Sequence, residues 1–310
     1  MNSMLGLVQG TIVESASSGL RYELVRRLGS GTSGEVWLCE EARDRQPRAV
    51  KIVPGSDALS IATEVEHSRR AMEAVGQEMV PHFFEASPGK IVERDHPPFL
   101  LIVLEFIDGA SVGDLVRKKP FPELIAKVVL KSLCKALARL HRQGIIHSDV
   151  KGDNLLISRE GRVVLCDFGV SVPLQDARDS AGVHVSGSPY FMAPELACKM
   201  KRAQMTYSDK IDIWSLGITA IEMTTGSTPW QKDPRTSCVA LEHFFHILVT
   251  EAEPTVSPDD DHSHEFVQMV SRCLVRSPPA RDSAEELLQC SFLQHCMDCS
   301  TFEKWCRENV

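Results

Sequence analysis

The pattern of apolar and polar residues changes character once along the chain. Over residues 21–53, short runs rich in Val, Leu and Trp alternate with Gly and polar turns, which predicts β-strands. A turn at residues 54–57 precedes an expected helix over residues 58–74. Strands are expected again over residues 81–105, where a Pro-Pro pair at 97–98 interrupts them. The first part of the chain is therefore predicted to consist of strands with one helix.

Beyond residues 108–109, apolar residues recur with helical spacing. The longest apolar stripe ends at Gly144 and is formed by Leu124, Val128, Val129, Leu133, Leu137 and Leu140. Two short strands are expected over residues 155–157 and 163–166, and mostly helices from residue 209 onward. This second part of the chain is therefore predicted to be larger and mainly helical.

These patterns predict an α+β fold with two lobes. Residues 1–20 are small and polar, and we expect them to form a loose N-terminal leader. The small β-rich lobe is expected over residues 21–106 and the helical lobe over residues 107–293, with a hinge near residues 105–109. Residues 294–310 are expected to form a C-terminal tail that covers the large lobe.

The composition fits a globular chain and limits the classes of partner. The 310 residues carry 34 basic and 42 acidic side chains, and 43% of them are hydrophobic, which excludes wholesale disorder. The net charge of −8 argues against nucleic acid as the main partner. No apolar run approaches the roughly 20 residues that a membrane-spanning helix needs, and we expect neither a secretory signal nor N-myristoylation.

Ten cysteines in a chain of this length indicate reduced thiols and a cytoplasmic location. Four of them, together with His295, gather near the C-terminus: Cys290, Cys296, Cys299 and Cys306. The spacing Cys296-x-x-Cys299 is compatible with half of a zinc site, but no second pair follows at a usual distance. Free thiols on a terminal helix are the favoured interpretation.

A glycine-rich segment stands near the start of the first lobe. Residues 28–36 read Leu-Gly-Ser-Gly-Thr-Ser-Gly-Glu-Val, which is the pattern G-x-G-x-x-G-x-V. Glycine lets the backbone approach a phosphate closely because no Cβ intervenes. A dinucleotide-binding turn would open a helix, whereas strand-like residues follow Val36, so a hairpin over a phosphate is favoured. A plain glycine turn is the alternative if this motif stands alone.

The segment Ala49-Val50-Lys51 places one lysine on an apolar strand. Burying a lysine costs free energy unless it meets an anion, so Lys51 is a candidate for binding nucleotide phosphates. A carboxylate on the following helix would hold this lysine in place. Glu64 is the preferred carboxylate and Glu66 is the alternative, while a surface lysine on a strand is the interpretation without function.

Two polar segments of the second lobe carry the groups that phosphoryl transfer needs. His147 to Asn154 read His-Ser-Asp-Val-Lys-Gly-Asp-Asn, and Asp167-Phe168-Gly169 follow. They supply a base, a cation and oxygen ligands for Mg²⁺, which prefers carboxylate and amide oxygens together with phosphate. Either segment alone is explained by polar turns with capping residues, but that explanation is poor for both in this order.

With these motifs the chain resembles a eukaryotic protein kinase. The resemblance covers about residues 22–293 and continues through Ala193-Pro194-Glu195, the segment Asp212–Gly217, and Arg281, which in the family pairs with the glutamate at position 195. Lys151 and the stretch Gly187-Ser188-Pro189-Tyr190 resemble the serine/threonine class. The stretches 187–195 and 212–230 are most similar to the sterile-kinase group, whose members include kinases upstream of MAP kinases.

The resemblance implies ATP and Mg²⁺ as cofactors and a protein substrate. Residues expected around ATP are Leu28, Gly29, Gly31, Gly34, Val36, Ala49, Lys51, Leu104, Glu105, Ile107, Asn154, Leu156 and Asp167. Lys51, held by Glu64, is expected to bind the α- and β-phosphates, and Asn154 and Asp167 to hold Mg²⁺. Asp149 is expected to accept the proton of the substrate hydroxyl, and Lys151 to neutralise charge on the transferred group. Ser188 is expected to hydrogen-bond the loop that carries these two residues.

Four positions depart from the family pattern. Ser148 stands where the family usually has the arginine that pairs with a phosphate on the activation segment, and His184 stands where many relatives have a phosphorylated Thr. We therefore expect activity without that phosphate, although Ser180 and Ser186 remain possible sites. Ser68 replaces an apolar residue on the helix, which suggests that a regulatory protein partner settles it. Cys166 precedes Asp167 and is expected to face the ATP pocket, with simple packing as the alternative.

Two other functions on the same fold are possible alternatives. A pseudokinase that binds nucleotide or partners without turnover usually lacks the lysine, the catalytic aspartate or the metal aspartate, and this chain has all three. A small-molecule kinase is disfavoured by Ala193-Pro194-Glu195 and the 187–190 stretch, which form a peptide-docking platform in protein kinases. The predicted function is therefore an active Mg-ATP-dependent protein serine/threonine kinase in a signalling cascade.

Overall fold

A computed structural model describes residues 5–31, 34–55, 58–92, 95–178, 188–201, 207–231, 241–256, 262–294 and 296–310. The chain divides into two compact units. Unit 1 comprises Met1–Glu73 and Pro81–Ile107, and unit 2 comprises Ala74–Val80 and Asp108–Val310. Unit 1 is rich in strands and unit 2 is mainly helical, as the sequence predicts. Among the described residues, no helix is both long and apolar enough to cross a membrane.

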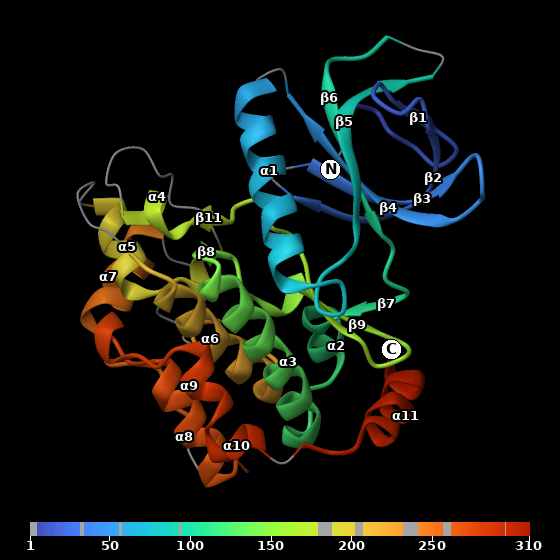
Figure 1. Ribbon diagram of the computed structural model, residues 1–310. Coiled ribbons are helices and arrows are strands. Elements are labelled where there is room, and N and C mark those ends of the chain that lie inside the picture. The colour runs from blue at the N-terminus through green and yellow to red at the C-terminus, as the bar shows by residue number, and fades with distance from the viewer. Residues whose placement is uncertain are drawn as a thin grey trace. The chain divides into compact units, whose positions relative to one another are not determined.

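Unit 1 is a closed barrel of six antiparallel strands with one helix (Figure 1). The barrel order is β1-β2-β3-β4-β6-β5. The strands are β1 (Ile12–Ser15), β2 (Arg21–Gly31), β3 (Gly34–Glu41), β4 (Pro47–Pro54), β5 (Phe83–Ile91) and β6 (Phe99–Glu105), and the helix is α1 (Ala58–Val75). The glycine segment thus includes the end of β2 and the start of β3, two paired antiparallel strands, as the hairpin interpretation predicts, and the residues that follow Gly34 form a strand and not a helix.

The expectation of a loose leader over residues 1–20 is wrong for the described part of that segment. Strand β1 pairs with β2 on one side and with β5 on the other, and this double pairing closes the barrel. Leu5, Leu7 and Val13 are buried in the barrel core. The sequence hides this strand because small polar residues surround a few apolar ones, and only the long-range partner β5 makes their burial possible.

The two faces of the barrel strands have different roles. Trp37, Val50 and Val103 point into the core, and residues two positions apart share a face of a strand. Val36, Ala49 and Leu104 occupy intervening positions and therefore lie on the outer face. Cross-strand pairs join Val36 to Lys51 and Ala49 to Leu104, so four predicted nucleotide residues form one contiguous patch there.

Unit 2 consists of a helical body and two small sheets (Figure 1). Its helices are α2 (Val112–Lys118), α3 (Glu123–Arg142), α4 (Leu174–Arg178), α5 (Pro194–Lys201), α6 (Lys210–Thr225), α7 (Leu241–Thr250), α8 (His264–Cys273), α9 (Ala284–Leu288), α10 (Ser291–Gln294) and α11 (Cys299–Asn309), with 3-10 turns η1 (Gly152–Asn154), η2 (Pro189–Phe191) and η4 (Pro278–Ala280). Helix α3 buries four members of the predicted apolar stripe, Val129, Leu133, Leu137 and Leu140, but the prediction is wrong for Leu124, which is exposed, and Val128 is half-buried. Helix α6 is buried along nearly its whole length. These two helices provide the rigid base on which the polar loops rest.

The small sheets hold the ends of those loops. Strands β9 (Leu155–Ser158) and β10 (Val163–Leu165) form a hairpin, and β9 also pairs with β7 (Gly109–Ser111). Strands β8 (Ile145–Ile146) and β11 (Val172–Pro173) pair with each other. The segment His147–Asn154 therefore leaves β8 and enters β9, while Asp167–Gly169 lie between β10 and β11. Strand pairing thus fixes both ends of each polar loop.

Residues Ala74–Val80 belong to unit 2 although unit 1 residues flank them in sequence. Two arginines bind their backbone carbonyl groups. Arg139 of α3 donates to the carbonyl of Val75, and Arg162 donates to the carbonyls of Gln77, Glu78 and Val80. The Arg139 guanidinium also holds the pKa of the Glu78 carboxyl below its usual value. Charged donors, together with the N–H of Leu165 in β10, which donates to the carbonyl of Met79, thus satisfy the backbone carbonyl groups of this segment.

A buried ion pair ties α5 to the end of the helical body. Arg281 has a fully buried side chain and donates two hydrogen bonds to Glu195, of 2.7 and 3.1 Å. The same guanidinium donates to the carbonyls of Val275 and Lys210 and lies over the ring of Trp214. The pairing expected from the resemblance is therefore present, and further hydrogen bonds offset part of its desolvation cost.

The C-terminal helix α11 packs on unit 2. Trp305 meets the ring of Phe121 edge-on at 5.2 Å, and Phe302 is buried. Cys306 is also buried on this helix, while Cys299 is exposed at its start. The cysteines of this region that the structure describes, Cys290, Cys296, Cys299 and Cys306, are free thiols. His295 lies outside the described residues.

Two glycines of the β2–β3 hairpin should respond differently to alanine. At Gly34 the φ angle is +132° and a Cβ would lie 2.3 Å from the carbonyl oxygen of Ile52, whereas a Cβ on Gly29 meets no atom within 4 Å. We expect Gly34→Ala to lower the free energy of unfolding by about 2 kcal/mol or more, and Gly29→Ala to change it by less than about 0.5 kcal/mol. Urea unfolding of both variants checks this, and equal losses would contradict the assignment.

Candidate active site

The carboxylate of Asp149 lies at the centre of the polar loop and is only 10% exposed. Its Oδ2 accepts hydrogen bonds from Lys151 Nζ at 2.7 Å and from Asn154 Nδ2 at 2.9 Å. Its Oδ1 accepts from the backbone N–H of Ser188 at 2.9 Å. Both oxygens are thus held by named donors, so the carboxylate has one fixed orientation.

Lys151 connects this loop to the segment that precedes α5. Its Nζ donates to Asp149 Oδ2 and to the hydroxyl of Ser188, both at 2.7 Å. The predicted hydrogen bond between Ser188 and the loop is therefore present. A substrate hydroxyl that approached Asp149 would find a cation directly beside the base, which is the arrangement that stabilises negative charge on a transferred group.

Asn154 supplies an amide group beside Asp149, and Asp167 supplies a carboxylate between β10 and β11. The amide nitrogen of Asn154 donates to the backbone carbonyl of Asp149 at 2.8 Å as well as to its side chain. Because both partners are acceptors, the Asn154 carbonyl oxygen must point the other way. Asp167 is exposed and its φ is +62°. One amide oxygen and one accessible carboxylate match the hard oxygen ligands that Mg²⁺ prefers, so the residues present fit that ion.

A buried carboxylate on α6 anchors the backbone before Asp149. Asp212 has no exposed surface, and it accepts hydrogen bonds from the backbone N–H groups of His147 and Ser148, each at 2.8 Å. Nε2 of His141 lies 2.8 Å from the same carboxylate. Three donors on two elements therefore converge on one anion, which fixes the start of the catalytic loop relative to α6.

The anchored backbone contains a residue in the left-handed region. Ser148 has a φ of +68°, which is costly for a residue with a Cβ. Its N–H is the one held by Asp212, and His147 is fixed on both ring nitrogens by the N–H of Asp149 and the carbonyl of Cys166. Strain next to the Asp149 carboxylate is thus maintained by buried polar contacts.

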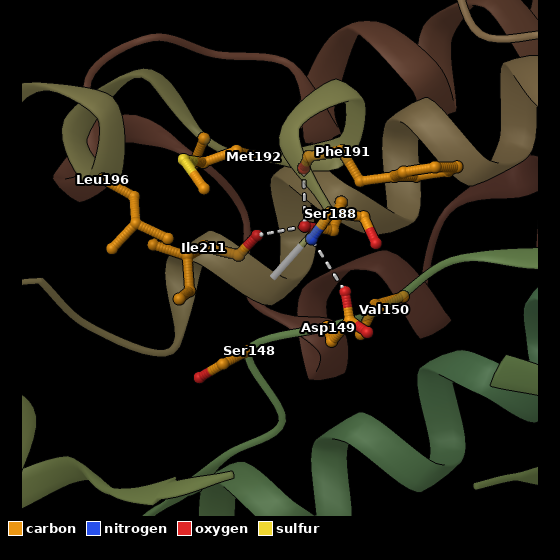
Figure 2. A pocket seen from close by; sticks show the side chains of 10 residues that line it. Ser148, Asp149, Val150, Ser188, Phe191, Met192, Leu196 and Ile211 are labelled. Carbon is orange, nitrogen blue, oxygen red and sulfur yellow. Dashed lines mark hydrogen bonds between the residues drawn. The ribbon is translucent and has the colours of Figure 1, made fainter. Parts of the chain in front are cut away.

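The catalytic loop and the segment before α5 line a pocket (Figure 2). Ser148, Asp149 and Ser188 contribute the polar part of its lining. The apolar part includes Met192, Leu196 and Ile211. Figure 2 also shows the hydrogen bond between Ser188 and Asp149, so the predicted peptide-docking segment touches the predicted base directly.

Cys166 follows β10 and is half-buried. Its N–H and its thiol both donate to the backbone carbonyl of Asn154, at 2.9 and 3.2 Å. These bonds link the residue before Asp167 to Asn154, the last residue of the loop that carries Asp149. Leu156 lies two residues further along β9 and is partly exposed. The position of Cys166 relative to a nucleotide stays a prediction.

The predicted residues of unit 1 lie on the outer face of its barrel. Lys51 is 9% exposed, which excludes a freely solvated surface lysine. Gly29 pairs with Val36, which pairs with Lys51, so the glycine segment and the lysine share one cross-strand row. Leu28 is exposed at the start of the segment, and Gly31 pairs with Gly34 at the tip.

Residues 105–107 end unit 1. The N–H of Glu105 donates to the carbonyl of His82, and the N–H of His82 donates back to the Glu105 carboxylate. Ile107 is buried two residues later. This exchange fixes the backbone from which the resemblance expects hydrogen bonds to the adenine base.

The contacts of Glu66 favour Glu64 as the carboxylate that pairs with Lys51. The Glu66 carboxylate binds Arg69 and Arg70 of its own helix, and these arginines hold the pKa of Glu66 below its ordinary value. Glu66 is therefore engaged elsewhere, which favours Glu64. Glu64 lies in α1, but its side chain is outside the described residues, so its pairing with Lys51 stays a prediction. Ser68 on the same helix is buried.

Three residues near the loop were not assigned roles from the sequence. Asp212 belongs to the segment Asp212–Gly217, which carries part of the family resemblance. Its contact with the loop joins residues that are 65 positions apart in the sequence. His141 looked like one more polar residue at the end of a helix. Glu222 follows ten residues after Asp212, and nothing in its sequence surroundings marks it. Their proximity to Asp149 results from the packing of α3 and α6.

Glu222 is buried beside the catalytic loop. Its carboxylate accepts the N–H of Gly152 at 3.3 Å. Burial, followed by the negative charge of Asp153, raises the pKa of Glu222 from 4.5 to about 7. Arg117 pairs with Asp153 and with Asp114, so its charge is shared between two other carboxylates. Glu222 is therefore a buried acid that changes charge near neutral pH.

Sequence comparison agrees with this geometry. The family model described as the protein kinase domain matches residues 22–293, so the chain belongs to the protein kinase family. The two units, the glycine hairpin and the loop around Asp149 are the parts that this family membership explains. Its relatives place it in the serine/threonine class.

Three relatives illustrate the similarity. The chain is 31% identical to mitogen-activated protein kinase kinase 1 of Arabidopsis thaliana, over 90% of this chain and 76% of that protein. It is 34% identical to serine/threonine-protein kinase sid1 of Schizosaccharomyces pombe, over 88% and 54%. It is 30% identical to serine/threonine-protein kinase max-2 of Caenorhabditis elegans, over 93% and 41%. The chain thus spans about half the length of the last two.

The stability of the protein should depend on pH through Glu222. Because its pKa is about 7 in the folded protein and 4.5 ordinarily, its contribution to stability is fully present below pH 4.5 and is lost as the pH rises through about 7. We expect the free energy of unfolding of Glu222→Gln, relative to the wild type, to increase between about pH 5 and pH 8 by on the order of 3 kcal/mol. Urea unfolding at both pH values measures this difference, and a difference that stays constant would contradict the assignment.

Proposed function

We propose that this protein is an active Mg-ATP-dependent kinase that transfers the γ-phosphoryl group of ATP to Ser or Thr hydroxyls of protein substrates. The observation that carries this proposal is the hydrogen-bonded set of Asp149, Lys151, Asn154 and Ser188. A base, a cation, an amide oxygen and the start of the peptide-docking segment converge there. Such a set serves phosphoryl transfer to a peptide hydroxyl and has no evident purpose in a protein that only binds nucleotide.

In this mechanism Asp149 orients the substrate hydroxyl and accepts its proton. Its fixed carboxylate provides a defined direction for that proton, and Lys151 stabilises the negative charge that develops next to it. Ser188 positions Lys151 through its hydroxyl and Asp149 through its N–H. Asn154 and Asp167 would hold Mg²⁺, which when bound neutralises phosphate charge.

Unit 1 would bind the nucleotide through its outer face. Gly29 has open space around its Cβ position and a φ that does not require glycine, so the fold itself does not explain this residue. Close approach of a phosphate explains it. Lys51 would bind the α- and β-phosphates with Glu64 as its partner. Val36, Ala49 and Leu104 would contact the adenine, and Glu105 and Ile107 would bind its edge.

The biological setting is proposed from the relatives. One similar protein is named a mitogen-activated protein kinase kinase, which favours a protein kinase of a MAP kinase cascade. Every cysteine that the structure describes is a free thiol, which supports a cytoplasmic location. The buried Ser68 on α1 supports a regulatory protein partner that settles this helix. A peptide array with Mg-ATP, comparing the wild type with Lys51→Met, would reveal the sequence preference of the substrate.

Removal of the base should separate catalysis from binding. We expect Asp149→Asn to lower kcat by about 100-fold to 10,000-fold, because the amide cannot accept the proton, while the Kd for ATP stays nearly unchanged. Lys51→Met should instead weaken ATP binding. Asp108→Asn, at an exposed carboxylate that faces Arg159, is the matched control and should retain activity. Normal turnover of Asp149→Asn would refute the assignment of the base.

Activity should not need a phosphate on the activation segment. Ser148 offers no positive charge to such a phosphate, and its buried hydroxyl has no hydrogen-bond partner in the described part of the chain. Ser180, His184 and Ser186 lie outside the described residues. We expect phosphatase treatment, and Ser180→Ala combined with Ser186→Ala, to leave kcat within about twofold of the wild type. Loss of activity in either experiment would overturn this expectation.

A further inference from the structure

A cluster of hydroxyl groups around one carboxylate fastens β1 to β5. Glu85 of β5 accepts hydrogen bonds from three hydroxyls: Ser15 at 3.0 Å, Ser18 at 3.0 Å and Tyr22 at 2.8 Å. The hydroxyls of Ser15 and Ser87 also lie 2.7 Å apart. We call these five residues the β1 latch. The latch joins β1, the turn after it, β2 and β5, so it holds the strand that closes the barrel.

Only one hydroxyl donor of the latch is open to solvent. Ser15 and Ser87 are 0% and 1% exposed, and Tyr22 is 1% exposed. Burial and the neighbouring Glu85 raise the pKa of Tyr22, so its hydroxyl stays a donor. Ser18 lies on the exposed turn of residues 16–19 between β1 and β2. A modifying enzyme can therefore reach Ser18 while the barrel stays closed.

The charge around the latch is negative. Within the described ranges, Glu85 is bound by hydroxyls and makes no ion pair. The nearby cations Arg21 and Lys90 both pair with Glu14, which lies within β1. Arg48, which acts on Tyr22, pairs with Glu41 and Asp44. A phosphate on Ser18 would replace a hydroxyl donor with a group of charge −1.5 to −2 beside a carboxylate. The hydrogen bond that now joins the side chain of Ser18 to Glu85 would become a repulsive contact.

We propose that Ser18 is a phosphorylation site and that phosphate at this position releases β1 from β5. This rests on the proposed function for its phosphoryl donor. In the reaction a bond forms between Ser18 Oγ and the γ-phosphorus of ATP, the bond from that phosphorus to the bridging oxygen breaks, and ADP departs. The hydroxyl proton passes to the Asp149 carboxylate of a second copy of this chain.

Release of β1 would change nucleotide binding through its effect on β2. Strand β1 pairs with the first residues of β2, where Ile12 faces Glu23 and Glu14 faces Arg21. The other end of β2 carries Gly29 and the turn that we assign to the phosphates. A β2 strand without β1 loses one of its two neighbours, so its glycine end is held less firmly. The modification therefore weakens ATP binding and acts as negative feedback.

Incubation of the full chain with Mg-ATP and a basic protein, followed by mass spectrometry, tests the donor. We expect phosphate on Ser18 in the wild type and none in Asp149→Asn. Transfer to the basic protein with Ser18 unmodified would overturn the Ser18 proposal alone. Absence of transfer to either would contradict the proposed function together with the donor assigned to Ser18.

Charge variants test the latch without any need for catalysis. We expect Ser18→Asp to lower Tm by about 4 °C or more and to raise the Kd for ATP, whereas Ser17→Asp, on the same exposed turn, changes Tm by less than about 1 °C. Adding Glu85→Gln to Ser18→Asp should restore most of the loss, because the amide does not repel the new carboxylate. Equal effects at positions 17 and 18, or no rescue by Glu85→Gln, would overturn the proposal. So would a rise in Tm, which would show that Arg21 or Lys90 had turned to the new charge.

Discussion

The anchoring of the catalytic loop by Asp212 is the interaction on which the rest of the site depends. A carboxylate without exposed surface is stable only if donors surround it, and here His141 and two backbone N–H groups of the loop do so. The Asp212 carboxylate and the loop depend on each other. The loop keeps its left-handed residue because the carboxylate holds it, and the carboxylate stays buried because the loop satisfies it.

The other contacts of the site build on this anchored backbone. Asp149 directly follows the strained Ser148. Lys151, Asn154 and Ser188 hold the two carboxylate oxygens of Asp149 in place. The same principle of charge held by fixed donors recurs at the pair of Arg281 and Glu195 and at the latch around Glu85. In each case long-range polar contacts hold the irregular segments, while apolar packing on α3, on α6 and in the barrel core holds the regular elements.

The sequence predicts the regular strands and helices better than it predicts the long-range polar contacts of the irregular segments. The strands over residues 81–105 and the helical stripe of α3 follow from local periodicity, because a strand or helix repeats its buried positions at a fixed spacing. Strand β1 escaped prediction since its four residues become a strand only between β2 and β5. The two arginines that bind the carbonyls of residues 75–80 likewise show no pattern in sequence, because an arginine can reach a carbonyl anywhere on the surface around it.

The sequence by itself determined the chemistry of this protein: which residues can serve as base, cation and metal ligand, and in what order they occur. Those roles need particular functional groups, so the residue types themselves carry the signal. Tertiary structure alone decided which partners orient them, that Glu222 lies against the loop, and that the first strand closes a barrel. Such contacts join residues far apart in the chain, and their free energy is gained only when packing brings them together.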